Sequence, residues 1–210
     1  LESLKWNKEG IIVDEQENPV KWVWKTWAWE TAIDQLREET EHYDLLNTTS
    51  EKEGKTPRLA DVLLREEIKV FEPLWTLIPS NKAILPVLWK LFPNHPLLLN
   101  TSYELNDDLI KTGYVIKPIV GRCGANIQLI DKNKNILANK EGNFSEREQI
   151  YQQLFALPKI ENYYVQISTF TSAGSYAGAA TRVDTDMIIG KDSDCMALRI
   201  EDDVNFLKIK

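Results

Sequence analysis

Short apolar runs separated by polar turns mark the first part of the chain. Residues 11–13 and 20–25 are largely apolar, and the polar residues 15–18 lie between them. Apolar runs on either side of a short polar turn are typical of a β-hairpin. A helix over residues 31–37 is predicted to follow this hairpin.

Apolar residues on one helical face recur farther along the chain. Residues 59–64 form an apolar run that predicts a buried helical turn or a strand. A helix is expected after Ser80, its N-cap, with Pro86 tolerated in the first turn. The apolar face of this helix is formed by Ile84, Leu85, Leu88 and Leu91. The two prolines within residues 92–96 then end the helix, and His95 is expected to fix the loop that follows.

From Gly113 onward the pattern changes to short β-like runs. Strands are predicted at residues 114–116, 127–130, 136–137, 164–170, 178–183 and 197–200. One helix over residues 146–155 is predicted to interrupt them, because Ile150, Tyr151 and Leu154 fall on one helical face. The predicted fold class is therefore α+β, with antiparallel sheets and packed helices.

A polar stretch near residues 38–57 separates two regions of different composition. It lacks hydrophobic periodicity, as a solvated loop or insertion does. We expect a Trp-rich α+β segment over residues 1–75, which includes this loop, and a second region over residues 76–210. The chain begins with Leu1 rather than Met and runs directly into strand-like sequence, so we expect it to be the later part of a longer protein.

Composition limits the classes of partner. The 210 residues are 43% hydrophobic and 27% charged, as in globular domains. The net charge of -7 argues against a nucleic-acid partner, because such proteins concentrate Lys and Arg to displace counterions. No secretory leader is recognisable, and no apolar run approaches the roughly 20 residues of a membrane span. Cys123 and Cys195 are too few for a disulfide framework, which indicates a reducing cytoplasm.

Several tryptophans lie close together near the start of the chain. They are Trp22, Trp24, Trp27 and Trp29. Such a cluster can stack on sugars or bases, but large aromatic side chains are more often found in a core or an interface. We therefore favour a core role for this cluster. A Trp-rich interaction domain that binds no nucleotide is the alternative.

The segment over residues 114–127 carries the most specific chemistry. A strand presents Lys117, then Gly121 and Gly124 frame a short loop that contains Arg122, and a second strand follows. Closely spaced glycines let backbone N–H groups converge on an anion, and Lys and Arg add positive charge, so the segment can hold phosphate. It is not a Walker loop, since no Gly-Lys-Ser/Thr is present and a strand follows. An ordinary turn with glycine at positive φ explains the same loop pattern.

Longer motifs in a fixed order resemble a known family. They are residues 24–30 (WKTWAWE), 71–75 (FEPLW), 80–89 (SNKAILPVLW), 92–98 (FPNHPLL) and 114–126 (YVIKPIVGRCGAN). Together they resemble the synthetase domain of glutathionylspermidine synthase and its bacterial relatives. The resemblance runs from near residue 6 to the C-terminus, apart from the polar loop.

This resemblance implies an ATP-grasp fold, in which nucleotide lies between two α+β lobes beneath a glycine-loop hairpin. The family's reaction activates a carboxylate as an acyl phosphate, which an amine then attacks. The chain is thus expected to be the ATP-binding portion of a carbon–nitrogen ligase that uses ATP and Mg²⁺. The implied substrates are a peptide-like carboxylate such as glutathione and a polyamine, and a homodimer is the assembly considered.

The resemblance also assigns nucleotide-contacting roles to individual residues. Lys82 and Lys117 match the family's phosphate-contacting lysines. Four residues match its glycine-rich loop, and they are Gly121, Arg122, Cys123 and Gly124. Without a neighbouring histidine to activate it, Cys123 is expected to be a small loop residue rather than a nucleophile.

Three further residues match positions nearer the reacting groups. Gln166 falls where the family lines its adenine pocket, whereas Arg182 and Lys191 match cationic positions near the transferred phosphate. Such cations can neutralise a triphosphate before a carboxylate approaches it.

The family's metal-binding Asp, Glu and Asn lie well upstream of the Trp-rich segment, so no metal ligand is expected in this chain. Four aspartates close to Arg182 match no metal motif, and they are Asp184, Asp186, Asp192 and Asp194. The leading hypothesis is a ligase portion that acts only together with an upstream lobe. The alternative is a nucleotide-binding module or inactive relative without ligase activity.

Overall fold

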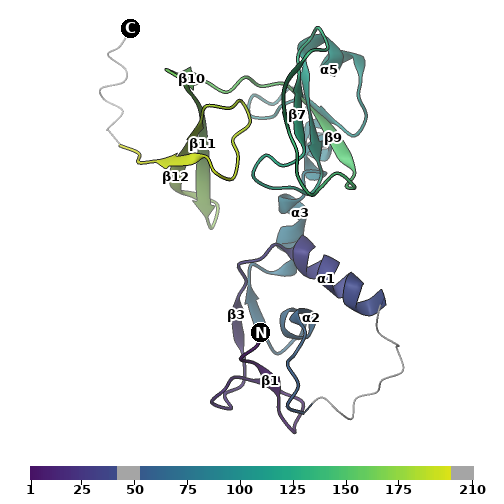
Figure 1. Ribbon diagram of the computed structural model, residues 1–210, viewed down its shortest axis with the longest axis vertical. Coiled ribbons are helices and arrows are strands. Elements are labelled where there is room, and N and C mark those ends of the chain that lie inside the picture. The colour runs from purple at the N-terminus through teal and green to yellow at the C-terminus, as the bar shows by residue number, and fades with distance from the viewer. Residues whose placement is uncertain (42–52, 200–210) are drawn as a thin grey trace. The chain divides into compact units, whose positions relative to one another are not determined.

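The computed structural model describes residues 1–41 and 53–199 and divides into two compact units, Leu1–Asn81 and Lys82–Lys210 (Figure 1). Part of the predicted polar loop, residues 42–52, lies outside the described residues, as do residues 200–210. Both units combine helices with strands, which confirms the predicted α+β class. Within the described ranges, no helix has the length and apolar character that a membrane crossing requires.

The first unit consists of short strands and helices. Its strands are β1 (Lys5–Trp6), β2 (Ile12–Val13), β3 (Trp22–Trp24) and β4 (Lys69–Phe71). Its helices are α1 (Trp29–Glu41), α2 (Leu59–Leu63), the 3-10 helix η1 (Leu74–Thr76) and α3 (Leu77–Ser80). β1 and β2 pair antiparallel, whereas β3 and β4 pair in parallel. The helix predicted over residues 31–37 is confirmed, and the run at 59–64 is largely helical.

The hairpin predicted from the two apolar runs near the start forms only next to its turn, where the backbone N–H of Val20 donates to the carbonyl of Ile12 at 2.9 Å. The polar turn itself forms, because the Asp14 carboxylate accepts hydrogen bonds from the backbone N–H groups of Gln16 and Asn18 at 2.9 and 2.8 Å. A single antiparallel bridge then joins Val13 to Pro19. Beyond this bridge the two strands have other partners, since β2 pairs with β1 and β3 pairs with β4.

The core prediction for the tryptophan cluster holds for one member. Trp29 is 4% exposed and packs with Ala32 and Leu63, whereas Trp22, Trp24 and Trp27 are 65%, 82% and 49% exposed. The prediction is wrong for these three, because their side chains are exposed rather than packed in a core. A second cluster of buried residues comprises Trp6, Ile12, Val62 and Ile68.

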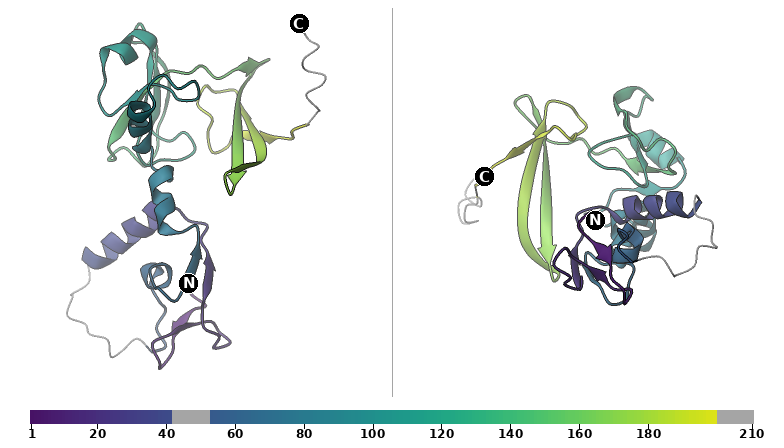
Figure 2. Two further views of the ribbon diagram at one scale, coloured as in Figure 1. Left: turned by 180° about the vertical axis from the view of Figure 1, so that it is seen from behind. Right: turned by 60° about the horizontal axis from the view of Figure 1, so that its bottom comes forward.

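The second unit holds two antiparallel sheets, shown from two sides in Figure 2. The five-stranded sheet has the order β5-β9-β6-β7-β8. Its strands are β5 (Thr101–Ser102), β6 (Tyr114–Pro118), β7 (Ile127–Ile130), β8 (Ile136–Lys140) and β9 (Gln149–Gln153). The four-stranded sheet runs in chain order through β10 (Lys159–Ile160), β11 (Tyr163–Ser172), β12 (Ser175–Asp184) and β13 (Asp194–Met196).

The helix predicted after Ser80 forms, but Ser80 does not cap it. This helix, α4 (Ile84–Leu91), has Ala83 at its N-cap and a buried Pro86 in its first turn. Ser80 instead ends α3, where its hydroxyl donates to the carbonyl of Leu77 at 3.0 Å. In the loop after α4, His95 Nδ1 accepts a hydrogen bond from the backbone N–H of Leu97 at 3.2 Å, as expected for a residue that fixes a loop.

Helix α5 (Asp107–Thr112) delivers the chain to the central strand β6. Asn106 caps it by accepting a hydrogen bond from the backbone N–H of Leu109 at 3.1 Å. Gly113 ends it at φ 85°. A Cβ at Gly113 would lie 2.9 Å from the carbonyl oxygen of Ile130, so only glycine lets β6 begin this close to β7.

The helix predicted over residues 146–155 is wrong, because residues 149–153 form strand β9 between β5 and β6. Ile150 and Gln152 are buried, while Gln149 is exposed. This is the alternation of a strand. The sequence hides it, since one of the buried positions is a polar glutamine.

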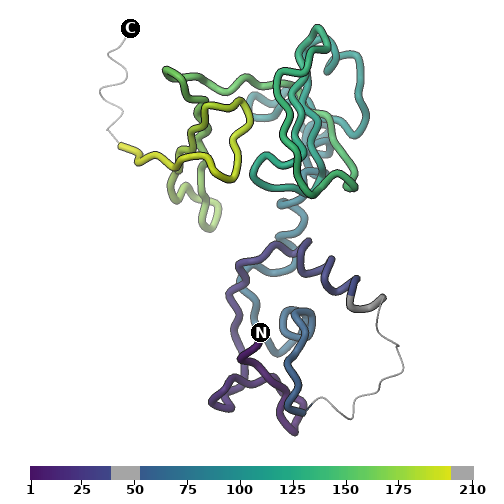
Figure 3. Tube along the Cα trace, viewed as in Figure 1, coloured from purple at the N-terminus to yellow at the C-terminus, as the bar shows by residue number. Residues whose placement is uncertain are grey.

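Strands β11 and β12 form one long hairpin, drawn in green to yellow-green in Figure 3. Gln166 lies opposite Arg182 in this hairpin, and Arg182 lies opposite Cys195 of β13. Side chains directly opposite one another point to the same face, so Gln166 and Arg182 share a face of this sheet. The last strand lies earlier than predicted, because β13 ends at Met196 and residues 197–199 are not a strand.

Candidate functional site

A cavity of about 350 Å³ lies within the second unit. Apolar side chains of β6 and β7 line it, and they are Val115, Ile127 and Leu129. Met187, Ile188 and Ile189, which follow β12, also line the cavity. Val115, Leu129 and Ile188 belong to one buried cluster, so the cavity is built directly on the core of this unit.

Several of the sequence-predicted residues meet at this cavity. Its lining includes Lys117, Cys123, Gly124, Gln166 and Arg182, which come from both sheets and from the loop between β6 and β7. Lys82, Gly121, Arg122 and Lys191 are not lining residues.

Lys117 is a half-buried cation of the cavity, as is Arg182. Its ammonium donates a hydrogen bond to Oε1 of Gln152 at 2.6 Å. Burial is the main cause that lowers the pKa of Lys117 from 10.5 to about 8, and the positive charge of Lys82 acts in the same direction. An anion in the cavity would stabilise the charged form of this lysine.

Gln152 is a lining residue that sequence reasoning missed. It is 7% exposed, and its Nε2 donates to Oγ1 of Thr101 at 3.0 Å. The wrong prediction of a helix over residues 146–155 is the reason, because the pairing of β9 with β5 and β6 is what brings Gln152 beside Lys117. Gln153 and the exposed Phe155 also line the cavity and were missed for the same reason.

The loop over residues 119–126 packs closely against the segment after β12. Cys123 and Gly124 have φ values of 51° and 74°. A Cβ at Gly124 would lie 2.7 Å from Cγ2 of Ile188 and 2.8 Å from the carbonyl oxygen of Ile189. Glycine at this position therefore allows the loop to approach the opposite wall of the cavity.

Lys82 makes two hydrogen bonds to this loop. Its backbone N–H donates to the carbonyl of Ile119 at 2.9 Å, and its ammonium donates to the carbonyl of Gly121 at 2.8 Å. Arg122 is exposed at the start of a tight turn, and its carbonyl accepts a hydrogen bond from the backbone N–H of Ala125 at 3.0 Å. The loop is thus positioned by backbone and lysine contacts together.

A hydrogen bond to the segment after β12 orients the Arg182 side chain. Its guanidinium donates to the carbonyl of Gly190, which is buried. The Asp184 carboxylate accepts hydrogen bonds from the hydroxyl of Ser193 and from the backbone N–H of Gly190. These contacts hold the segment that carries Met187 to Ile189 against the strands, and Lys191 follows Gly190 as an exposed cation.

Asp184 is committed to that structural role. The hydroxyl of Ser193, followed by the backbone N–H of Asp186, lowers the pKa of Asp184 below its ordinary value. Across residues 1–41 and 53–199, no group of three or more His, Cys, Asp or Glu side chains is placed to hold a metal ion. Among these same residues, none that lines the cavity carries a carboxylate. The described residues of this cavity therefore offer no carboxylate ligand for Mg²⁺.

The residues do fit a nucleotide. Two cations, three glutamines and a set of apolar side chains line one cavity. Apolar walls suit an aromatic base, and cations without opposing carboxylates suit phosphate. The donor set thus matches an anionic ligand with a flat apolar part.

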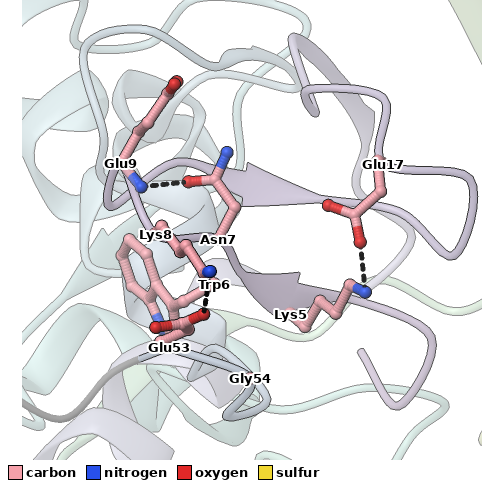
Figure 4. A pocket seen from close by; sticks show the side chains of 8 residues that line it. All are labelled: Lys5, Trp6, Asn7, Lys8, Glu9, Glu17, Glu53 and Gly54. Carbon is pink, nitrogen blue, oxygen red and sulfur yellow. Dashed lines mark hydrogen bonds and ion pairs between the residues drawn. The ribbon is translucent and has the colours of Figure 1, made fainter.

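Two hollows in the first unit are less suited to such a ligand. One, of about 550 Å³, is lined by Trp22, Trp24, Phe71 and Glu72, and its only charged lining group among the described residues is a carboxylate. In the other, drawn in Figure 4, Lys5 pairs with Glu17, and Lys8 lies 4.0 Å from Glu53. The carboxylate of the first hollow would repel an anionic ligand, and the lysines of the second already lie close to carboxylates.

Replacing Gly124 by alanine should loosen the wall of the cavity. The new methyl group would collide with Ile188 and Ile189, in addition to the strain of a positive φ. Gly174 is a matched control, because it has φ 79° and a Cβ added there would meet nothing within 4 Å. Gly174→Ala should cost about 1–2 kcal/mol of unfolding free energy, and Gly124→Ala should cost clearly more. Urea denaturation measures both, and equal costs would contradict the packing described.

The buried charge of Lys117 should appear in the pH dependence of stability. A lysine whose pKa is lower in the folded chain binds fewer protons when folded, so stability rises as pH increases between about 8 and 10.5. Lys117→Met removes this contribution. The difference in unfolding free energy between the two proteins should therefore change by on the order of 3 kcal/mol over that interval. Urea denaturation from about pH 7 to about pH 11 tests this, and parallel pH curves would show that the ammonium is not desolvated.

Comparison with known proteins adds a family to this geometry. Residues 1–201 match the family described as glutathionylspermidine synthase preATP-grasp. The chain is 49% identical over 195 residues to the bifunctional glutathionylspermidine synthetase/amidase of Escherichia coli (strain K12), covering 92% of this chain and 32% of that protein.

A second relative has a different product in its name. The chain is 41% identical over 204 residues to trypanothione synthetase of Crithidia fasciculata, covering 95% of this chain and 31% of that protein. The chain thus spans about a third of the length of these relatives. These matches confirm the resemblance found in the sequence motifs, and the chain belongs to the glutathionylspermidine synthase preATP-grasp family.

Proposed function

We propose that the cavity of the second unit binds ATP for a carboxylate–amine ligation. The observation that carries the proposal is the pair of cations, Lys117 and Arg182, in a cavity whose described lining residues include no carboxylate. A triphosphate supplies the negative charge that such a pair lacks. The half-buried ammonium of Lys117 gains most from it, because a charge removed from water is costly without an opposite charge nearby.

The apolar walls accommodate the base. Val115, Leu129 and Ile188 belong to one buried cluster that lines the cavity, so this cluster offers apolar surface against which a flat ring can pack. Gln153 and Gln166 supply amide groups that can donate to or accept from the edge of a purine. Gln166 is assigned to the base on this ground.

The phosphates are assigned to the side of the cavity that carries charge and loop. Lys117 and Arg182 would contact phosphate oxygens directly, and Gly121 to Gly124 would cover them as a glycine-loop hairpin of ATP-grasp type. Lys82 acts on the same loop through its bond to the carbonyl of Gly121. Lys191, exposed after Gly190, is assigned to the transferred phosphate, as is Arg182.

The relatives are named as synthetases, which supports a ligase reaction. In that reaction ATP supplies the phosphoryl group that activates a carboxylate for attack by an amine. Within this chain, Lys117 and Arg182 neutralise charge, and the apolar walls exclude water from the phosphates. We assign nucleotide binding to residues 76–210 and part of the synthetase core to residues 1–75.

The proposal also includes the substrates, the metal ion and the cellular location. The names of the relatives favour a glutathione-like carboxylate and a polyamine amine as substrates. Mg²⁺ would come with the nucleotide and be held by groups other than the described ones. Cys123 and Cys195 are free and exposed, which supports a reducing cytoplasm as the location.

A nucleotide-binding module without ligase activity is the second candidate. Family membership does not establish which reaction a member performs, and the chain spans only about a third of the length of its relatives. The two candidates differ in the turnover of the full-length protein, because only a ligase releases ADP when a carboxylate and an amine are both supplied. Tight nucleotide binding without release of ADP, whether or not the substrates are present, would favour the module.

ATP analogue binding tests the nucleotide proposal itself. Titration calorimetry with a non-hydrolysable ATP analogue and Mg²⁺ should show binding to this chain. Lys117→Ala and Arg182→Ala should each weaken it about 10-fold or more, since each removes a charge-assisted bond to phosphate. Lys132→Ala is the matched control, because Lys132 is exposed in the turn between β7 and β8 and is not a lining residue.

The control should bind like the parent chain. Absence of binding to the parent chain would remove both nucleotide candidates. Equal weakening by Lys132→Ala would mean that binding reflects net charge rather than this cavity.

A further inference from the structure

A string of hydrogen bonds runs behind Lys117 to a backbone carbonyl. The Lys117 ammonium donates to Oε1 of Gln152 at 2.6 Å, and Nε2 of Gln152 donates to Oγ1 of Thr101 at 3.0 Å. The Thr101 hydroxyl in turn donates to the carbonyl of Leu99 at 2.9 Å. Thr101 is 3% exposed and Gln152 is 7% exposed, so water has little access to the string.

The string has one permitted direction. An ammonium only donates, so the amide of Gln152 must turn its oxygen toward Lys117 and its NH₂ group away. The Thr101 hydroxyl donates its proton to the carbonyl of Leu99, so its oxygen faces Gln152 as an acceptor for that NH₂ group. A flipped amide would place two donors against each other at Lys117 and would leave Thr101 without its bond.

We propose that Thr101 is a positioning residue, which acts through Gln152 to hold the Lys117 ammonium toward the nucleotide cavity. Thr101 is not itself a lining residue, whereas Gln152 and Lys117 both are. This role rests on the proposed function as far as nucleotide is concerned. The contacts that define it exist independently of any ligand.

Strand register makes the arrangement possible. Thr101 lies directly opposite Gln152 in the β5–β9 pair, and Gln152 lies opposite Val115 in the β9–β6 pair. Lys117 is two residues beyond Val115 and therefore points to the same face, diagonal to Gln152. Long side chains bridge such a diagonal, so three neighbouring strands deliver one connected row.

The row compensates for an unfavourable electrostatic setting. Lys82 is the charged neighbour that lowers the pKa of Lys117, and Arg182 lines the same cavity. No carboxylate among the described lining residues offsets these charges. A fixed amide oxygen is thus the acceptor that steadies the ammonium before an anion arrives.

Nucleotide affinity is the first measure of this role. Thr101→Val keeps the shape but removes the hydroxyl, so Gln152 can turn, and affinity for the ATP analogue should fall ~2- to 10-fold, the effect of one buried hydrogen bond. Thr101→Ser keeps the hydroxyl and should restore most of the affinity. In a Lys117→Ala background, Thr101→Val should have no further effect, because the group that it positions is gone.

A ligand-free measure separates the positioning role from nucleotide binding. The pKa of Lys117 can be obtained from the pH dependence of amine labelling at this residue, read by mass spectrometry. In Thr101→Val the pKa should fall below the value of about 8 in the parent chain, because the charged form loses a fixed acceptor. In Gln152→Glu it should rise, because a carboxylate then faces the ammonium.

The outcomes distinguish the two proposals. If the parent chain binds no nucleotide but these pKa values move as expected, the proposed function fails and the positioning role stands. If nucleotide binds and Thr101→Val changes neither affinity nor the pKa of Lys117, the positioning role is overturned. Should Thr101→Val not fold, Gln152→Glu still decides, since an unmoved pKa there would disprove the contact on which the role depends.

Discussion

The half-buried ammonium of Lys117 is the constraint on which the rest of the cavity depends. A cation removed from water needs acceptors or opposite charge, and the described residues that line this cavity include no carboxylate. Gln152 meets part of that need with a neutral oxygen. Burial and the charge of Lys82 still lower the pKa of Lys117, and an anionic ligand would oppose both effects. The proposed assignment of function rests on how this charge is accommodated.

The chain achieves this with elements that lie far apart in sequence. Strand β9 enters between β5 and β6 and brings Gln152 beside Lys117. Gly124 lets the loop after β6 pack against Ile188 and Ile189, and the bonds of Arg182 and Asp184 hold that segment in place. The same contacts that form the core of the unit therefore also form the walls of its cavity.

The central part of this fold could be predicted from sequence, because its signals are local. The apolar runs on either side of the loop and the glycines within it predict two strands joined by a turn. The structure has this arrangement, since β6 and β7 pair as an antiparallel hairpin. The position of β9 could not be predicted, because Gln152 looks like an exposed residue until partners 35 and 51 positions away bury it. Ile150 and Leu154 then fit a helix as well as a strand.

The predicted burial of the tryptophan cluster is wrong at Trp22 and Trp24 for a related reason. Trp22 and Trp24 are two residues apart in β3 and share one face of the strand, so their burial would require other elements packed over that face, whereas they are 65% and 82% exposed. Lys25 was similarly hidden, since its ammonium is buried by bonds to the carbonyl of Trp27 and to the Glu72 carboxylate, 47 residues away. Charge and hydrophobicity describe single positions, whereas burial is decided by partners that the local pattern does not contain.

Hydrogen–deuterium exchange of this chain, with and without an ATP analogue and Mg²⁺, tests the central claim most directly. If the cavity built around Lys117 is the nucleotide site, the analogue should slow exchange in residues 114–130, 149–153 and 182–190, the segments that contain most of its lining residues. Peptides of the Leu1–Asn81 unit should then exchange largely unchanged. Protection confined to that first unit, or no protection in residues 114–130 at saturating analogue, would contradict the account.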